Sequence, residues 1–260
     1  MFRRVFVPAF ASFKRIEMWQ WIVALVLQQF GTVLSIGDYA GTDLFASDTG
    51  IWEYLIININ TYALWLSLGA MVLSASCGVL HRDDAMKCMA QGSRARFAVS
   101  NTVSALLTVL LYMAMYFVIT VLLGALFFNI TALDIWKSNM LPERFTAAVR
   151  PSGAFFISFA LMTAYLFVLM QLCMCINLML QKPVGSIAGC LLLGTVLFPL
   201  WQADYSLAET FMLPYLTADG GMGIPKAAVL WSLLVILSAP AAVLSVSGAD
   251  MLMRAREGET

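Results

Sequence analysis

The run ALLTVLLYMAMYFVITVLLGALFF, from Ala105 to Phe128, decides the fold. It contains no charged residue, and it does not alternate apolar with polar side chains as a half-buried strand or a strand of a membrane β-barrel would. A helix needs about 20 predominantly apolar residues to cross a hydrocarbon core about 30 Å thick. The run therefore predicts a membrane-spanning helix.

The whole chain repeats this character. Of its 260 residues, 61% are hydrophobic and 12% are charged, and the mean hydropathy is +0.85, which excludes an ordinary water-soluble globule. We expect an all-α polytopic membrane protein, in which residues 1–260 form one transmembrane domain. The six predicted transmembrane helices cover residues 18–37, 54–79, 98–127, 155–181, 184–201 and 227–251.

The positions of the basic residues predict the orientation in the membrane. The fifteen Lys and Arg are balanced by fifteen Asp and Glu, so no basic surface for nucleic acid is expected. Eleven of the basic residues fall in the N-terminal segment, in the connections after the second and fourth spans, and at the C-terminus. The positive-inside rule then places both termini in the cytoplasm.

Two segments outside the spans have their own character. Phe2, Phe6, Phe10 and Phe13 recur at helical spacing beside basic residues, which predicts an amphipathic interfacial helix over residues 1–17. On the outer side, residues 202–225 are partly apolar but are broken by Pro214 and glycines, and we expect short helices that re-enter the membrane face.

Catalytic and metal-binding patterns are weak in this sequence. Cys173-x-Cys175 is better explained as buried free thiols than as a metal site, because His81 is the only histidine and lies beyond another span. No phosphate-cradling glycine–lysine loop is present, and no nucleophile with its base falls within a span. We expect no enzyme, no metal and no bound cofactor, so any energy source must come from a partner.

Several polar side chains do fall within the predicted spans, where burial in hydrocarbon is costly unless they face protein, a cavity or a ligand. Asn58 and Asn60 follow Glu53 in the outer part of the second span, and Gln28 lies in the first. They could line a pathway for a substrate, or they could simply form hydrogen bonds between helices. Gln29, Gln171 and Asn177 are further amides of this kind.

Small residues mark one face of the fifth span. Gly185 and Gly189 are four residues apart, with Ser186 and Ala188 between them, and this spacing allows another helix to approach closely. The partner helix could belong to the same chain or to a second copy.

The inner connection from residue 81 to residue 97 has the features of a short cytoplasmic helix. Asp83 or Asp84 can cap its start, and Met86, Lys87 and Met89 would lie along it. Such a helix suits docking into a groove on a partner, and a solvated connector is the equal alternative.

A resemblance favours docking. The segment AQGSRARF, from Ala90 to Phe97, and the following VSALLTVLLY, from Val103 to Tyr112, resemble the Gly-Ser-Arg segment that opens the third span in second-type permeases of ATP-binding cassette (ABC) exporters, especially small bacterial ones. The layout is similar too, with an interfacial N-terminal helix, six spans, a coupling helix after the second span, and an outer segment before the sixth.

The resemblance implies a permease subunit in a bacterial plasma membrane, paired as a homodimer or heterodimer. A separate nucleotide-binding subunit would bind ATP and Mg and drive the export of a hydrophobic or amphipathic cargo, such as a peptide, an antibiotic or a lipid-like molecule. Gly185 and Gly189 would then contribute to permease pairing. The residues implied to contact the ATPase are Asp83, Asp84, Met86, Lys87, Met89, Gln91, Gly92, Ser93, Arg94, Lys182 and Pro183.

Two other classes remain open from the sequence. A stand-alone membrane immunity or sensor protein would bind a peptide without ATP. An intramembrane enzyme would lose turnover when one or two polar residues were replaced.

Overall fold

The computed structural model describes residues 9–10, 13–14, 16–39, 50–77, 94–127, 131–137, 146–147, 149–180, 182–196 and 223–258. Over these ranges the fold is all-helical, with one isolated β-bridge between Gly50 and Thr131. The helices are α2 (Met18–Tyr39), α3 (Ile51–Thr61), α4 (Ala63–Ser74), α6 (Arg94–Phe127), α8 (Pro151–Leu180), α9 (Val184–Val196) and α11 (Ile224–Gly258).

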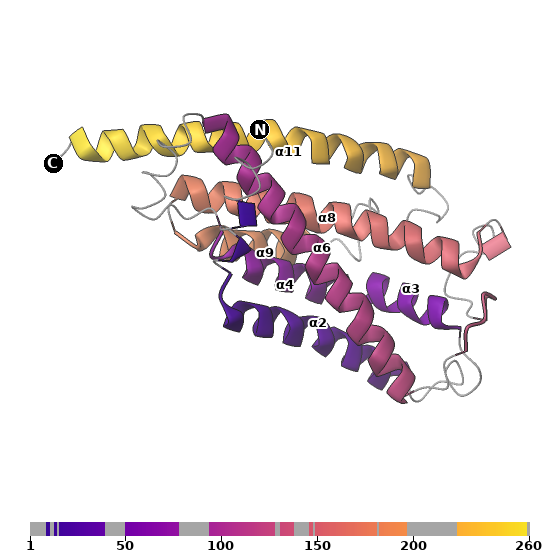
Figure 1. Ribbon diagram of the computed structural model, residues 1–260. Helices are drawn as coiled ribbons and strands as arrows, with labels where there is room; N and C mark the ends of the chain where they lie inside the picture. Colours follow the sequence, from indigo (N-terminus) through magenta and orange to yellow (C-terminus); the bar gives the residue numbers. More distant parts are fainter. Residues whose placement is uncertain are drawn as a thin grey trace.

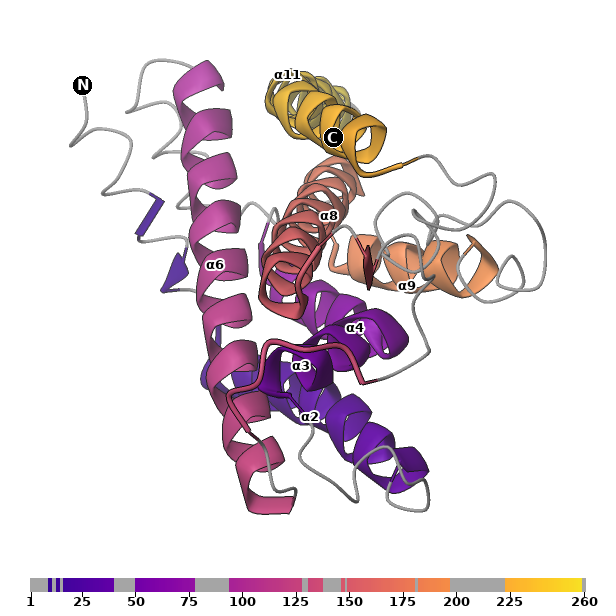
Figure 2. The same cartoon turned by 90° about the vertical axis from the view of Figure 1, so that its right-hand side faces the viewer.

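Helix α8 lies at the centre of the bundle. In Figure 1, α11 packs along one side of it, the end-to-end pair α3 and α4 packs along the other, and α2 covers that pair from outside. Helix α6 crosses these layers obliquely on one flank, and α9 packs on α8 and α4 on the opposite flank, as Figure 2 shows. Every described helix except α2 therefore contacts α8 extensively.

Close approach between α4 and α6 depends on one glycine. A Cβ at Gly69 would lie 2.0 Å from the hydroxyl of Tyr112 on α6 and 3.0 Å from the carbonyl oxygen of Ala24 on α2. Since no other residue fits there, Gly69 sets the distance at which the three helices meet. Tyr112 is fully buried in the largest core cluster.

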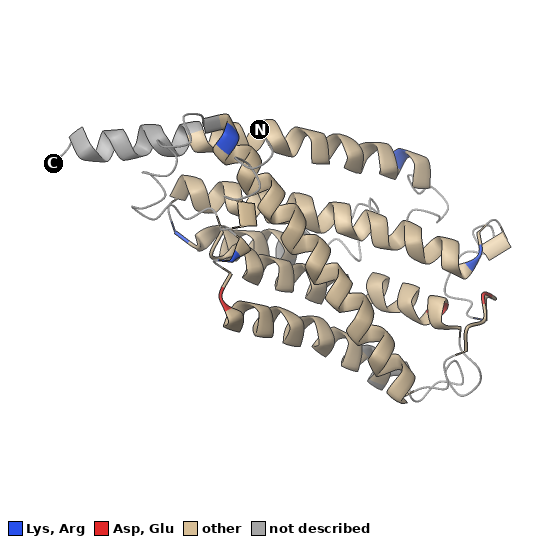
Figure 3. Cartoon of the chain, in the orientation of Figure 1, with Lys and Arg blue, Asp and Glu red and all other residues tan. Residues whose placement is uncertain are grey.

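The outer surface of the helices is suited to lipid. Leu126, Ile236 and Leu244 are 78%, 66% and 72% exposed, and they lie among many other exposed large apolar side chains. In Figure 3 the coloured charged residues lie at helix ends and in connections, while the middles of the described helices carry none. An apolar belt of this extent with charged ends is typical of a membrane-embedded protein.

The structure supports only part of the six-span prediction. Among the described residues, Ala95–Phe127, Pro151–Leu180 and Ile224–Val246 are long and apolar enough to cross a membrane, and α3 with α4 makes a fourth if the bent pair is one span. The predicted spans 18–37 and 184–201 correspond to α2 and α9, whose apolar stretches Met18–Leu34 and Val184–Leu193 are shorter. The described residues confirm an all-helical fold with three or four candidate membrane spans, and the count of six remains a prediction.

A short segment crosses the end of the bundle where α3 and α8 begin. In this strap, residues 131–137, the carbonyl oxygen of Thr131 accepts a hydrogen bond from the backbone amide of Ile51 (3.0 Å). The carboxylate of Asp134 accepts hydrogen bonds from the backbone amide and the hydroxyl of Ser152 (2.8 and 2.9 Å). Asp134 thereby satisfies a free N–H group in the first turn of α8 and complements the positive end of that helix. Gly50 is required beside the strap, because a Cβ there would lie 2.6 Å from the carbonyl oxygen of Leu133.

Some predicted features lie outside the described residues. Most of the interfacial segment 1–17 does, although Phe13 packs against Trp21 (6.0 Å between ring centroids) and Lys14 lies over the ring of Phe10. The coupling segment from residue 81 to residue 93 and the outer segment from residue 202 to residue 222 also lie outside them.

Candidate functional site

The second predicted span, residues 54–79, is broken in its first half. Helices α3 and α4 meet at Tyr62 with a bend of 66°, and Tyr62 itself has φ −112° and ψ 25°. Asn60, just before the break, weakens the helix: its side-chain Nδ2 donates a hydrogen bond to the carbonyl oxygen of Ile56 one turn earlier (2.8 Å) and so competes with the backbone hydrogen bonds of the helix. Backbone that leaves the helix within a membrane is stable only where protein or a polar cavity surrounds it.

A buried polar cluster lies beside this break. Asn58 Oδ1 accepts hydrogen bonds from Thr32 Oγ1 on α2 and from Tyr116 Oη on α6, both over 3.3 Å. All three side chains are at most 2% exposed. The cluster therefore joins three helices through a single amide oxygen, while Asn58 Nδ2 has no hydrogen-bond partner in the structure.

Gln28 lies between this cluster and a second polar contact. One turn before Gln28, the carbonyl oxygen of Ala24 accepts from Tyr112 Oη (3.5 Å), and one turn after it Thr32 donates to Asn58. Since residues four apart share a helix face, Gln28 faces the same interface. It is 2% exposed, and neither of its amide atoms has a partner.

The uncharged side chains at this interface can recognise a ligand through hydrogen bonds. Gln28 and Asn58 together offer two unpaired amide donors and one unpaired acceptor in a low-dielectric interior, where an unmade hydrogen bond costs about 1–3 kcal/mol. These groups can accept a ligand that itself carries donors and acceptors. They cannot act as acid or base, since amides and hydroxyls do not titrate near neutral pH.

The other two predicted pathway residues lie elsewhere. Asn60 points towards α8, where its Nδ2 is 3.5 Å from Ser158 Oγ. Glu53, in the first turn of α3, accepts from the backbone amide of Lys137 in the strap at 3.1 and 3.3 Å. The structure thus brings Gln28 and Asn58 to one interface and separates them from Asn60 and Glu53.

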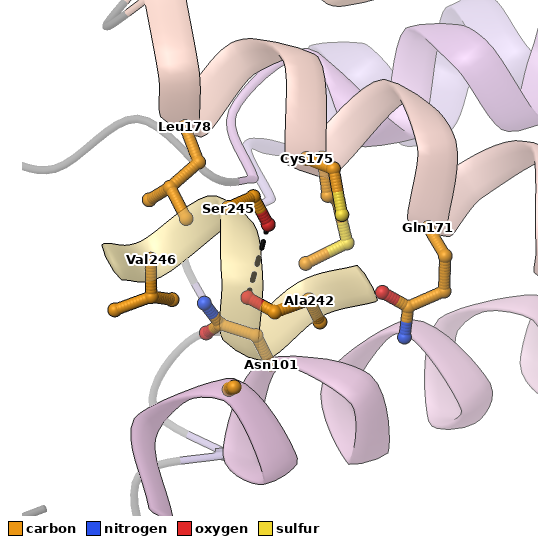
Figure 4. Close-up of a pocket in the computed structure, with 9 residues that line it drawn as sticks. Asn101, Gln171, Cys175, Leu178, Ala242, Ser245 and Val246 are labelled. Carbon is orange, nitrogen blue, oxygen red and sulfur yellow. Dashed lines mark hydrogen bonds between the residues drawn. The ribbon is translucent and has the colours of Figure 1, made fainter. Parts of the chain in front are cut away.

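A small pocket between α6, α8 and α11 forms a second polar spot. Figure 4 shows Asn101 of α6, Gln171 and Cys175 of α8, and Ser245 of α11 around it. Gln171 is 3% exposed and its Nε2 is unpaired. Ser245 is satisfied within its own helix by the carbonyl oxygen of Ala242 (2.9 Å). The pocket is too small for more than water.

The strongest polar junction lies where α4 ends and α9 begins. Asn177 on α8 is fully buried, and its Nδ2 donates to the carbonyl oxygens of Ser74 (3.1 Å) and Cys77 (3.2 Å). Its Oδ1 accepts from the backbone amide of Gly185 (2.5 Å). The hydroxyls of Ser74 and Ser186 share a further bond of 3.0 Å. One amide therefore satisfies the open ends of two helices.

A second amide holds the same end of α4 to α2. Gln20 Nε2 donates to the carbonyl oxygen of Val72 (3.3 Å), and Gln20 Oε1 accepts from Ser76 Oγ (2.7 Å). The last turn of α4 is therefore fixed to α2, α8 and α9 directly before residue 78.

The predicted pairing glycines face inward. A Cβ at Gly185 would lie 2.4 Å from the carbonyl oxygen of Cys173, and one at Gly189 would lie 2.7 Å from Cys173 Sγ. Both glycines therefore pack against α8 of the same chain. Packing within the chain was one of the two interpretations that their spacing allowed. The face of α9 that remains exposed carries Ile187, Leu191 and Leu192.

The predicted second ATPase contact, Lys182 and Pro183, is exposed in the turn between α8 and α9. Of the first contact only Arg94 is described, as the first residue of α6. The other residues of that set lie outside the described part of the chain.

Sequence reasoning missed Thr32, Tyr112 and Tyr116, although a signal existed. Gln28 and Thr32 are four residues apart, as are Tyr112 and Tyr116, so each pair marks a polar stripe on an otherwise apolar helix. That signal predicts a shared interface, but it does not identify the partner helix.

No protein-family model, no curated protein and no solved structure matches the chain.

Proposed function

We propose that the chain is the permease subunit of an ABC exporter of the second type, which works with a separate ATPase subunit and a second permease in a bacterial plasma membrane. The support from sequence is the Gly-Ser-Arg segment at residues 92–94 and the similar layout of the whole chain. The proposal assigns ATP binding and Mg binding to the partner and none to this chain.

In this proposal six spans cross the membrane. Helix α2, with 22 residues, is about 33 Å long, which is enough to cross a hydrocarbon core of about 30 Å. Helices α3 and α4 form one broken span, and α6, α8 and α11 are three more. Helix α9 begins the fifth predicted span, which continues past residue 196. Both termini, the connection from residue 78 to residue 93, and the turn at Lys182 and Pro183 then face the cytoplasm.

The observation that carries the proposal is the junction made by Asn177. The two connections that the resemblance implies as ATPase contacts leave the membrane at the end of α4 and at the turn between α8 and α9. Asn177 bonds to both, through Cys77 and Gly185. A partner that displaced either connection would therefore act on the same buried side chain, Asn177.

The mechanism is mechanical. ATP binding would close the partner's nucleotide-binding sites and move the coupling segment, and the span formed by α3 and α4 would change its arrangement at the break beside Tyr62. A span that is already broken at Tyr62 is the element we expect to take two positions. Cargo would bias this equilibrium only through a different affinity for the two states.

A hydrophobic or amphipathic cargo fits the same region. The unpaired amide of Gln28 and the unpaired Nδ2 of Asn58 lie beside the break, among apolar side chains and tyrosines. Movement of the span formed by α3 and α4 away from α2 would expose these groups to a cargo that carries its own hydrogen-bonding groups.

Replacing Met86 and Met89 together with Asp tests the docking assignment. The double variant should lose its ATPase subunit during affinity purification, because two carboxylates cannot enter an apolar groove. The matched control, Met86→Leu with Met89→Leu, should retain it. Retention of the ATPase by the Asp variant, with the membrane domain folded, would contradict the docking assignment.

The stand-alone immunity or sensor protein remains the second candidate, and one observation favours it. The unpaired buried amide of Gln28 and the unpaired Nδ2 of Asn58 are suited to capturing a peptide whether or not an ATPase is present. This candidate predicts full function in cells that lack every ATPase able to bind the chain.

A further inference from the structure

The small pocket between α6, α8 and α11 brings polar groups from three helices together. Its polar lining residues are Asn101 of α6, Gln171 and Cys175 of α8, and Ser245 of α11, and the other lining residues are apolar (Figure 4). Each helix therefore supplies at least one hydrogen-bonding side chain to the same space.

Gln171 is the lining group that most needs a ligand. Its side chain is 3% exposed, and its Nε2 has no hydrogen-bond partner within the protein. A buried donor without a partner is costly, and most buried polar groups are satisfied by protein or by ordered water. Because Gln171 lines a pocket, a ligand there can meet its donor.

The other two helices offer acceptors to the same ligand. Ser245 Oγ directs its single proton to the carbonyl oxygens of Ala241 (3.0 Å) and Ala242 (2.9 Å), so the lone pairs of the hydroxyl can still accept a hydrogen bond. Asn101, which is partly buried, carries an amide oxygen. A ligand that accepts from Gln171 and donates to Ser245 and Asn101 would join all three helices.

Size and charge together select the ligand. The pocket has room for about one water molecule. The unpaired group is an N–H donor, which repels a metal cation, and no lining residue carries a charge that could balance an anion. Water is neutral, accepts as well as donates, and typically makes about three hydrogen bonds when it is buried.

We propose that this pocket binds one structural water molecule. The water accepts a hydrogen bond from Gln171 Nε2 and donates its two protons to Ser245 Oγ and to the side-chain oxygen of Asn101. It thereby joins α8 to α11 and to α6 at one point.

This water gives the two sides of α8 different kinds of junction. Gln171 and Asn177 are six residues apart, so they lie on different faces of the helix. Asn177 bonds directly to the backbone at the end of α4 and at the start of α9. Gln171 reaches α6 and α11 through water instead. The site needs no ATPase, so its test is independent of the proposed transport function.

Solid-state NMR with magnetisation transfer from water tests the site directly, on the full chain in lipid bilayers. With ¹⁵N-labelled glutamine, the side-chain NH₂ signal of Gln171 is the one that disappears in Gln171→Leu. We expect rapid transfer from water to this signal. Transfer to the NH₂ group of Gln28, assigned in the same way with Gln28→Leu, should be several times slower, because Gln28 is equally buried and does not line the pocket.

The stability of the same two variants is a second measurement. Gln171→Leu removes the donor that holds the water and leaves the acceptors of Ser245 and Asn101 without it, so the equilibrium constant for unfolding in micelles should rise about tenfold. Gln28→Leu is the matched control, since it removes an equally buried amide that has no partner and no water to lose. It should leave that constant unchanged or lower it.

Two results would overturn the proposal. The first is transfer from water to Gln171 that is absent or no faster than transfer to Gln28. The second is a Gln171→Leu variant at least as stable as the wild type, because a dry pocket gains from an apolar side chain. If Gln171→Leu does not fold, Gln171→Met replaces it in both measurements, since methionine keeps the unbranched shape of glutamine and adapts to irregular space.

Discussion

The side-chain amide of Asn177 on α8 donates to the carbonyl oxygen of Ser74, the last residue of α4, over 3.1 Å. The same amide group bonds the carbonyl oxygen of Cys77 and the backbone amide of Gly185. Helix ends expose unpaired carbonyl and amide groups, and in a membrane interior water cannot satisfy them. Asn177 satisfies both ends and thereby fixes the relative positions of α4, α8 and α9.

Asn177→Leu should therefore destabilise the folded protein. The substitution keeps the volume but leaves two carbonyl oxygens and one N–H group without their partner, and we expect a loss of about 1–3 kcal/mol in the free energy of unfolding. Denaturant titration in micelles, followed by circular dichroism, measures the loss. Ser232→Ala is the control, since Ser232 is exposed and bonds only within its own helix; an equal loss in the control would remove any special role for Asn177.

Gly69→Ala should also destabilise the protein, because the new Cβ meets the hydroxyl of Tyr112 at 2.0 Å. Overpacking of this kind costs about 1–3 kcal/mol. Combining it with Tyr112→Phe removes the nearest atom, and the pair should lose less stability than the sum of the two single variants. The ring carbon at 2.8 Å keeps the rescue partial. Simple additivity in this double-mutant cycle would show that α4 and α6 do not meet here.

Gln28→Leu distinguishes the two interpretations of the buried amides. Since neither amide atom of Gln28 has a partner, an apolar side chain of similar size should leave the free energy of unfolding unchanged or raise it by up to about 1 kcal/mol. Thr32→Val, which removes a hydroxyl that donates to Asn58, should instead lower it. If Gln28→Leu is the less stable of the two, Gln28 forms a structural hydrogen bond between helices.

Pairing of two permeases should involve the exposed face of α9. In membranes under mild oxidation, Leu191→Cys in a chain that lacks the native cysteines should form a disulfide between copies, because Leu191 is 64% exposed. Gly189→Cys in the same background should not, since that position faces α8 within the chain. Crosslinking at position 189 without crosslinking at position 191 would reverse the assigned faces.

The sequence predicts the helices well where the apolar run is continuous. The expected spans 98–127 and 155–181 correspond to α6 (94–127) and α8 (151–180), because such runs have only one way to satisfy their backbone in lipid. The break at Tyr62 was not predicted. The stretch before it, Ile56 to Thr61, alternates apolar residues with two asparagines, and only the contacts of Asn58 and Asn60 show why the helix stops.

The contacts between α4, α8 and α9 could not be predicted from the sequence, for a different reason. Met71, Cys173 and Cys190 lie near one another only through the packing of α4, α8 and α9. Cys175, two residues after Cys173, lies on another face of α8 and lines the pocket between α6, α8 and α11. Gly185 and Gly189 were recognised as a close-packing face, but spacing alone could not choose between α8 and a second copy.

The measurement that tests the central claim most directly is gentle purification of the tagged wild-type chain from its native host, with mass spectrometry of every bound protein and an ATPase assay. We predict a nucleotide-binding subunit in equal amount with the chain, and ATP hydrolysis by the purified complex. Repeated absence of such a subunit from folded protein would contradict the permease and leave the stand-alone binding protein.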